Sequence, residues 1–96
     1  MLQIRSNCEN CNKSLAPNST KAMICSYECT FCADCVNEVL HNVCPNCGGG
    51  FEKRPIRPKG GIAKHPPSGK LVFNPVDMET FLPLMEKNEN IPPDQR

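Results

Sequence analysis

The sequence predicts a small α+β domain that is stabilised at its cysteines and followed by an extended C-terminal arm. Three observations support this prediction. The chain has 96 residues, too few for two full domains. It has no tryptophan and few long aliphatic residues, so an apolar core alone is small for stable folding. Its eight cysteines make a cysteine-based scaffold the leading interpretation.

The cysteines form four close pairs, and this pattern is typical of metal binding. The pairs are Cys8 and Cys11, Cys25 and Cys29, Cys32 and Cys35, and Cys44 and Cys47. Two or three intervening residues let both sulfurs of a pair face one ion. Asn12 and Gly48 follow the first and last pairs and suit the left-handed conformation in which such loops often end. Eight thiolates divide naturally into two tetrahedral sites, the geometry of structural zinc.

The choice between disulfides and metal depends on the compartment. The first residues, Met1–Asn7, show no charged start, apolar stretch or cleavage site of a signal peptide. No segment approaches the roughly 18 apolar residues that span a membrane. We therefore expect a cytoplasmic chain without membrane contact, where clustered cysteines hold metal more often than they pair with one another.

Two arrangements of the metal sites fit the four pairs. In a sequential arrangement, the first two pairs bind one ion and the last two bind the other. In a cross-braced arrangement, site one is Cys8, Cys11, Cys32 and Cys35, and site two is Cys25, Cys29, Cys44 and Cys47. The short spacing between Cys29 and Cys32 and the helix predicted after the third pair favour cross-bracing. The sequential arrangement stays open.

Zinc is the expected metal, with two ions per chain. The ferredoxin spacing of iron–sulfur proteins does not occur. The last pair, with Gly48 after it, would suit a rubredoxin-type iron, but the first pair is followed by Asn12 instead of glycine. A site with four sulfurs leaves no coordination position for water or substrate. We therefore expect structural zincs, no catalytic residue and no enzymatic activity.

The chain divides into three segments of different composition. Residues 1–52 contain every cysteine, and a helix is predicted from Ala33 because four apolar residues follow at helical spacing: Val36, Val39, Leu40 and Val43. Residues 53–70 are rich in proline, glycine and basic residues and read as a linker or extended arm. This basic arm is expected to be a solvated tether or to dock on the acidic, thiolate-rich core.

Residues 71–96 form a short apolar segment that we expect to be partly helical or frayed. Leu71–Phe73 is a candidate strand, and Asp77 is a candidate N-cap. The face of the predicted helix is Met78, Phe81, Leu82 and Met85. Pro83 should kink or divide this helix, and Ile91–Arg96 should be frayed. The apolar face either packs on Phe31 and Phe51 or binds a partner protein.

The order and spacing of the cysteines resemble those of the RING finger. The gaps of two, thirteen, three, two, two, eight and two residues lie within that family's range, and Cys44-Pro-Asn-Cys47 matches its closing motif. Residues 1 to about 57 are still closer to a group of short bacterial proteins of unknown function that are RING-like and zinc-binding. The resemblance implies a RING-like or treble-clef cross-brace with two zinc sites. Cys29 stands where the RING family commonly has histidine.

Ubiquitin ligase activity is not expected, because the positions through which RING ligases contact their partner depart from that pattern. Glu9 and Asn10 replace an apolar residue, Val39 and Leu40 are the nearest substitutes for a bulky helix residue, and Gly48 replaces a basic one. The predicted function is therefore a protein-interaction or adaptor module with structural zincs.

Two alternative functions remain open on the sequence. The basic arm could bind nucleic acid through its unopposed lysines and arginines, although no aromatic residue is interleaved with them. Clustered zinc thiolates could instead sense oxidation by releasing metal. His41 and His65 are expected to be surface residues rather than ligands.

Overall fold

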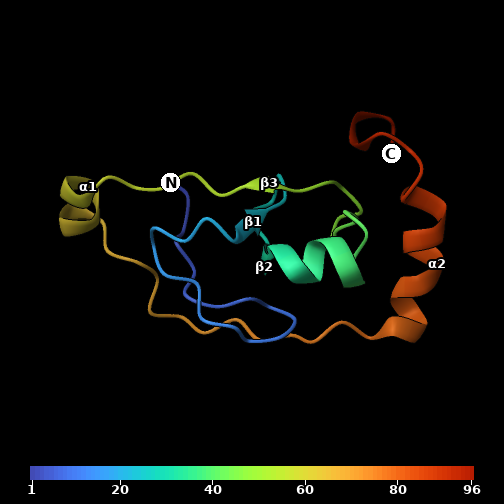
Figure 1. Ribbon diagram of the computed structural model, residues 1–96, viewed down its shortest axis with the longest axis horizontal. Helices are drawn as coiled ribbons and strands as arrows, with labels where there is room; N and C mark the ends of the chain where they lie inside the picture. Colours follow the sequence, from blue (N-terminus) through green and yellow to red (C-terminus); the bar gives the residue numbers. More distant parts are fainter.

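The computed structural model describes residues 1–96, and a three-stranded antiparallel sheet lies at its centre (Figure 1). The strands are β1 (Ala22–Ile24), β2 (Thr30–Cys32) and β3 (Glu52–Lys53), in the order β2-β1-β3. In β1, Met23 lies opposite Phe31 of β2 and opposite Lys53 of β3. The strands are short: β1 ends directly before a cysteine and β2 ends at one, and the chain turns at both places.

The helix predicted after β2 is present, but it is shorter than its apolar pattern suggests. A π-helical turn, η1, covers Cys35–Val39, and the Leu40 amide donates to the Cys35 carbonyl at 2.8 Å. Residues 41 and 42 follow with φ of 50° and 59°, and this left-handed pair stops the helix. Val43 is fully buried yet lies beyond the helix. The spacing therefore identified core positions and overestimated the helical length.

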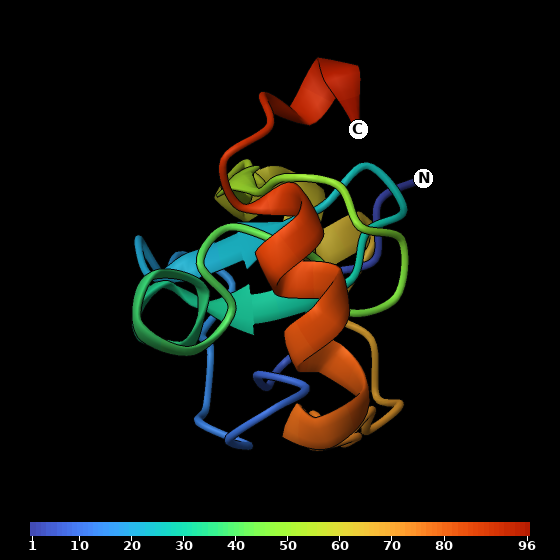
Figure 2. The ribbon, with the colours of Figure 1, turned by 90° about the vertical axis from the view of Figure 1, so that its right-hand side faces the viewer.

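One buried cluster joins the sheet, η1 and the C-terminal helix α2 (Met78–Asn88). The rings of Phe31 and Phe51 meet edge to face, with centroids 5.4 Å apart and planes at 77°. Figure 2 shows α2 lying across the end of the sheet, and Phe81 of α2 belongs to the same buried cluster as the two rings. The apolar face of α2 therefore packs on this chain's own core, the first of the two alternatives left by the sequence.

The N-terminus of α2 was predicted correctly. The Asp77 carboxylate accepts from the Thr80 hydroxyl at 2.8 Å and from the Glu79 amide at 3.1 Å. These two hydrogen bonds, the one from Thr80 first, hold the pKa of Asp77 below its usual value. Asp77 is thus a capping residue of the helix. None of the helices is long and apolar enough to cross a membrane.

The body of α2 differs from the prediction in two ways. The helix runs from Met78 to Asn88 without a division at Pro83, which is exposed, so water can replace the missing amide donor. Its buried face contains Phe81 and Met85, whereas Leu82 remains 39 % exposed. The helix is therefore rotated relative to the predicted apolar face.

Two predictions for the C-terminal segment are wrong. Leu71–Phe73 is extended but forms no strand, because the Val72 carbonyl accepts from the side chain of Asn7 rather than from a neighbouring strand. The chain end is not frayed: Pro93–Gln95 forms a 3-10 turn, η2, and the Arg96 guanidinium donates to the main-chain carbonyls of residues 42 and 48. The amino-acid composition does not show which distant carbonyls will accept hydrogen bonds from the Arg96 guanidinium.

The basic arm docks on the rest of the chain, but not on acidic groups. Its first residue belongs to β3, so the sheet crosses the boundary expected after residue 52. Arg54 is 3 % exposed and donates to the carbonyls of Arg5 at 2.7 Å and Ala16 at 3.0 Å. Arg57 donates to the Leu2 carbonyl. The arm then forms a short helix, α1 (Lys59–Lys64).

A buried carboxylate ties the first cysteine loop to β2. Glu9 is 4 % exposed, and its Oε2 accepts from the Thr30 amide and from the Arg5 guanidinium, each at 2.9 Å. The Glu9 amide in turn donates to the Thr30 carbonyl at 3.1 Å. These contacts cover the outer edge of β2, which would otherwise present unpaired backbone groups.

We predict that Arg54→Met destabilises the protein by about 2 kcal/mol, because the Arg5 and Ala16 carbonyls lose their charged donor. Urea unfolding of the metal-loaded protein measures this change. Lys53→Met, at the exposed neighbouring position, should leave the free energy of unfolding within error. Equal effects of the two variants would contradict the role assigned to Arg54.

We also predict that Glu9→Ala costs about 3 kcal/mol of unfolding free energy, because it leaves the buried Thr30 amide and the Arg5 guanidinium without their acceptor. Asp34→Ala is the matched control, since it removes the exposed ion pair with Lys13 at 3.3 Å and should change stability very little. A thermal or urea melt compares both variants. An unchanged free energy of unfolding in Glu9→Ala would show that the hydrogen bonds of Glu9 do not stabilise the fold.

Candidate metal centre

The first group of thiols combines the first and third cysteine pairs. The sulfur atoms of Cys8, Cys11, Cys32 and Cys35 all lie within 4.8 Å of one another. Cys11 Sγ and Cys32 Sγ are 3.7 Å apart. A tetrahedral zinc with Zn–S bonds of about 2.3 Å separates its sulfurs by about 3.8 Å. The observed separation therefore fits a four-sulfur metal site.

The loop around the first pair is shaped by its own backbone. The Cys8 amide donates to the Lys13 carbonyl at 2.9 Å, and the Asn12 amide donates to the Cys8 carbonyl at 3.0 Å. Asn12 has φ of 63°, as expected from its tolerance of the left-handed region. The resulting tight loop turns both sulfurs of the pair to one side.

The third pair belongs to the junction between β2 and η1. Cys32 is the last residue of β2, and Cys35 is the first residue of η1. The Cys35 amide lies 3.5 Å from Cys32 Sγ and donates to it. Amide donation of this kind stabilises a thiolate, which is the form that binds metal.

The second group draws on the second and fourth pairs. The sulfurs of Cys25, Cys44 and Cys47 lie within 4.8 Å of one another. Cys29, the fourth ligand expected here, has its thiol beside that of Cys25 but does not meet the same limit with all three. Its sulfur accepts from the Asn46 side-chain amide at 3.4 Å. The second group therefore brings three sulfurs together, with the Cys29 thiol next to one of them.

The loop around the fourth pair mirrors the first. The Gly48 amide donates to the Cys44 carbonyl at 2.7 Å, and Gly48 has φ of 78°, as expected. The Gly49 amide donates to Cys47 Sγ at 3.4 Å. At the second pair, the Tyr27 amide donates to Cys25 Sγ at 3.3 Å. At the first pair, the Lys13 backbone amide donates to the Cys11 thiol. Each of the four cysteine loops or junctions therefore directs a backbone N–H at a sulfur.

The thiols differ in acidity because they differ in burial and hydrogen bonding. Burial raises the pKa of Cys44 and of Cys35 far above the ordinary value of a thiol. At Cys11, burial opposes ionisation, but hydrogen bonds from the Lys13 backbone and the Cys8 thiol outweigh it and lower the pKa. In a metal-free fold the Cys35 and Cys44 thiols would be protonated, so metal binding there has to displace their protons.

Neither histidine joins a thiol group. His41 Nδ1 lies 3.2 Å from Oε2 of Glu89, the residue directly after α2, and the His41 side chain is 49 % exposed. His65 is exposed beside α1. Both positions agree with the expectation that they are surface residues.

The docked arm leaves fewer basic groups for nucleic acid than its composition suggests. Arg54 and Arg57 use their guanidinium groups on backbone carbonyls. The remaining basic residues of the arm are exposed lysines: Lys53, Lys59, Lys64 and Lys70.

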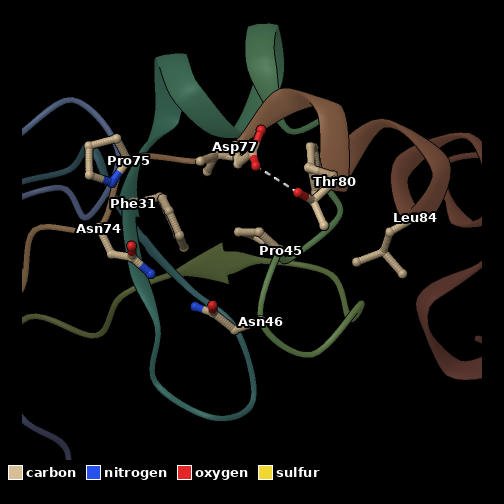
Figure 3. A pocket seen from close by; sticks show the side chains of 10 residues that line it. Phe31, Pro45, Asn46, Asn74, Pro75, Asp77, Thr80 and Leu84 are labelled. Carbon is tan, nitrogen blue, oxygen red and sulfur yellow. Dashed lines mark hydrogen bonds between the residues drawn. The ribbon is translucent and has the colours of Figure 1, made fainter.

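A groove of about 330 Å³ lies beside the fourth cysteine pair. Figure 3 shows that its labelled residues come from β2, the loop of the fourth pair, the segment before α2 and the first turns of α2. The apolar lining includes Phe31, Phe81 and Leu84, and the only charged residue that lines it is Asp77. The groove is thus apolar at its base and mildly acidic at its rim.

Sequence reasoning identified the thiols but missed the polar residues around them. Asn10 donates to Cys35 Sγ at 3.4 Å, and Asn46 donates to Cys29 Sγ. Each lies between the two cysteines of a pair. A position between two paired cysteines could have predicted this role. A side chain there lies close to the sulfurs of its own pair and of the other pair in the same group.

Comparisons with known proteins identify the family of the cysteine-containing part of the chain. A family described as "Protein of unknown function (DUF1272)" matches residues 1–57, which contain all the cysteines. An uncharacterized protein of Rhizobium meliloti (strain 1021) is 49 % identical over 75 residues, which cover 78 % of this chain and 89 % of that protein. No solved structure matches. The chain belongs to the DUF1272 family of cysteine-rich proteins.

Proposed function

We propose that the protein binds two structural zinc ions in a RING-like cross-brace and acts as a protein-interaction module. Site one consists of Cys8, Cys11, Cys32 and Cys35, and site two consists of Cys25, Cys29, Cys44 and Cys47. The supporting observation is that four sulfurs from distant parts of the chain lie within 4.8 Å of one another at site one. Zinc accepts this ligand set without redox chemistry.

The role proposed for both ions is structural. Four thiolates fill the coordination sphere of zinc, so neither water nor substrate has a position on the metal. No nucleophile paired with a base accompanies the sites. The zincs would instead supply folding free energy, on the order of 10 kcal/mol per site, to a chain with a small apolar core.

Ligase-type adaptor activity is not part of this proposal, because the C-terminal segment lies over the positions where RING ligases bind their partner. The side-chain amide oxygen of Asn10 accepts from the Val76 amide at 2.9 Å. A side chain at Gly48 would meet Asn88 and Leu84 of α2 at 3.4 Å and 3.8 Å. Leu40, the candidate helix residue, is fully buried. A conjugating enzyme would have to displace this segment.

The groove beside the fourth cysteine pair is the interaction surface that we propose, and its occupant is a basic peptide segment with an apolar anchor. The half-buried side chains of Val76 and Leu84 in its lining offer the apolar contact. Asp77 at the rim and Glu79 and Glu86 on the exposed side of α2 are acidic. Each zinc with four thiolates would add a net charge of about −2 nearby. Charge complementarity therefore favours a cationic partner.

We predict two zincs per chain by elemental mass spectrometry, for protein purified without added metal or a polyhistidine tag. Chelation should unfold the protein, which circular dichroism would record. Cys32→Ser and Cys44→Ser, one at each site, should each reduce the zinc content by about one ion. Ser26→Ala, next to a ligand but not one itself, is the control.

Other metal contents would contradict this proposal in distinct ways. Iron would indicate electron transfer, and no metal together with four disulfides would indicate an oxidised scaffold. One zinc, with ready disulfide formation at the second group, would favour the redox-sensor alternative, for which Cys11 and Cys47 are the exposed thiols.

We predict that a peptide with lysines around one phenylalanine shifts the amide resonances of Asn46, Thr80 and Leu84 in an NMR titration. The shifts should weaken as salt is added. A matched peptide with glutamates in place of the lysines should cause no shifts. Leu84→Ala, which shortens a half-buried side chain of the groove lining, should weaken the response. Equal shifts from both peptides, or shifts located on the arm, would contradict the groove as the interaction surface.

A further inference from the structure

Residues 71–77 run in an extended conformation against the first cysteine loop. The Asn7 side-chain amide donates to the Val72 carbonyl at 2.8 Å. The Asn74 amide donates to the Glu9 carbonyl at 2.8 Å. The orange segment in Figure 1 passes beside the blue N-terminal loop before it reaches α2. Backbone and side-chain contacts thus hold the segment to the loop along most of its length.

Asn10 connects this segment directly to a thiol of the first group. Its amide oxygen accepts from the Val76 amide at 2.9 Å, and its amide nitrogen donates to Cys35 Sγ at 3.4 Å. One planar group therefore contacts both the docked segment and a proposed metal ligand. When either contact is made, the amide is already oriented for the other.

The rest of the C-terminal segment covers the second group of thiols. Leu84 and Asn88 of α2 lie against Gly48, which directly follows Cys47. The Arg96 guanidinium donates to the Gly48 carbonyl at 3.1 Å. Phe81 is 3 % exposed in the shared core. Residues 71–96 therefore contact the loops of both cysteine groups, although they lie outside residues 1–57 matched by the family.

We propose that residues 71–96 form an intramolecular clasp that retains the metal ions, and that Asn10 is the positioning residue that couples the clasp to site one. This inference rests on the proposed zinc sites. Contacts made by the neighbours of metal ligands commonly change metal affinity by about 10-fold to 100-fold. Because such coupling is reciprocal, bound metal also holds the clasp in place.

Three variants of the full-length protein test the role of Asn10. Asn10→Leu removes both hydrogen bonds and keeps a side chain of similar size. Asn10→Asp keeps an acceptor for the Val76 amide but replaces the donor to Cys35 with a carboxylate oxygen. Asn37→Ala, at an exposed asparagine of η1, is the control. Zinc content is measured first, then zinc release to a chromogenic chelator, and hydrogen exchange of residues 71–90 by mass spectrometry.

The expected results differ between the variants. Asn10→Leu should release one of its two zincs about 10-fold faster and should exchange faster across residues 71–77. Asn10→Asp should also release one zinc faster, with a smaller change in exchange, because the Val76 contact survives. Asn37→Ala should behave as wild type. Wild-type release from Asn10→Leu would overturn the coupling.

A second pair of variants tests the clasp away from the ligands. Phe81→Ala should loosen α2 and speed zinc release, whereas Leu82→Ala, on the exposed side of the same helix, should do neither. Arg54→Met lowers stability without touching the clasp and controls for general destabilisation. Faster exchange of α2 in Phe81→Ala with unchanged zinc release would overturn the clasp.

The zinc content of each sample separates the two possible failures. Two zincs in every variant with equal release rates would overturn the clasp and leave the zinc sites standing. A wild-type protein without zinc would overturn the proposed function, and the clasp inference with it.

Discussion

Cys8 and Cys35 are far apart in the sequence, yet their sulfur atoms lie within 4.8 Å of each other. This proximity constrains the conformation of the chain between them. β1 and β2 are only three residues long because each leads directly to a cysteine loop. η1 is a single turn that begins at a cysteine. Sheet and helix of this size are marginal on their own. The thiol groups, and the metal that we propose for them, therefore provide the constraint on which the rest of the fold depends.

Polar residues near the thiols form hydrogen bonds that connect the cysteine loops to the parts of the chain without cysteines. Glu9 connects the first loop to β2, and Arg54 connects the arm to the N-terminal segment. Asn10 and Asn7 hold residues 71–77 on the same loop. Each of these side chains is buried or half-buried, and each satisfies backbone groups that would otherwise lose hydrogen bonds. The arm and the C-terminal segment are thus parts of one folded unit rather than tethers.

Local signals in the sequence were sufficient for the cysteine pairs, the left-handed residues Asn12 and Gly48, and the cap at Asp77, because each depends on residues close in sequence. They were insufficient where a distant partner decides the structure. Arg54 and Arg96 donate to carbonyls far away in the sequence. The sequence left the arm open between a solvated tether and docking on the acidic core, and the terminal position of Ile91–Arg96 suggested a frayed end. The rotation of α2 likewise depends on Phe81 and Met85 entering the shared core, which spacing within the helix does not encode.

The pairing of the cysteines is the central claim, and cadmium-113 NMR tests it most directly. Cadmium binds thiolate sites in place of zinc, and its scalar couplings to cysteine β protons identify the ligands of each ion. The account predicts two resonances, one coupled to Cys8, Cys11, Cys32 and Cys35, and the other to Cys25, Cys29, Cys44 and Cys47. A resonance coupled to Cys8, Cys11, Cys25 and Cys29 would show sequential sites and contradict the cross-brace.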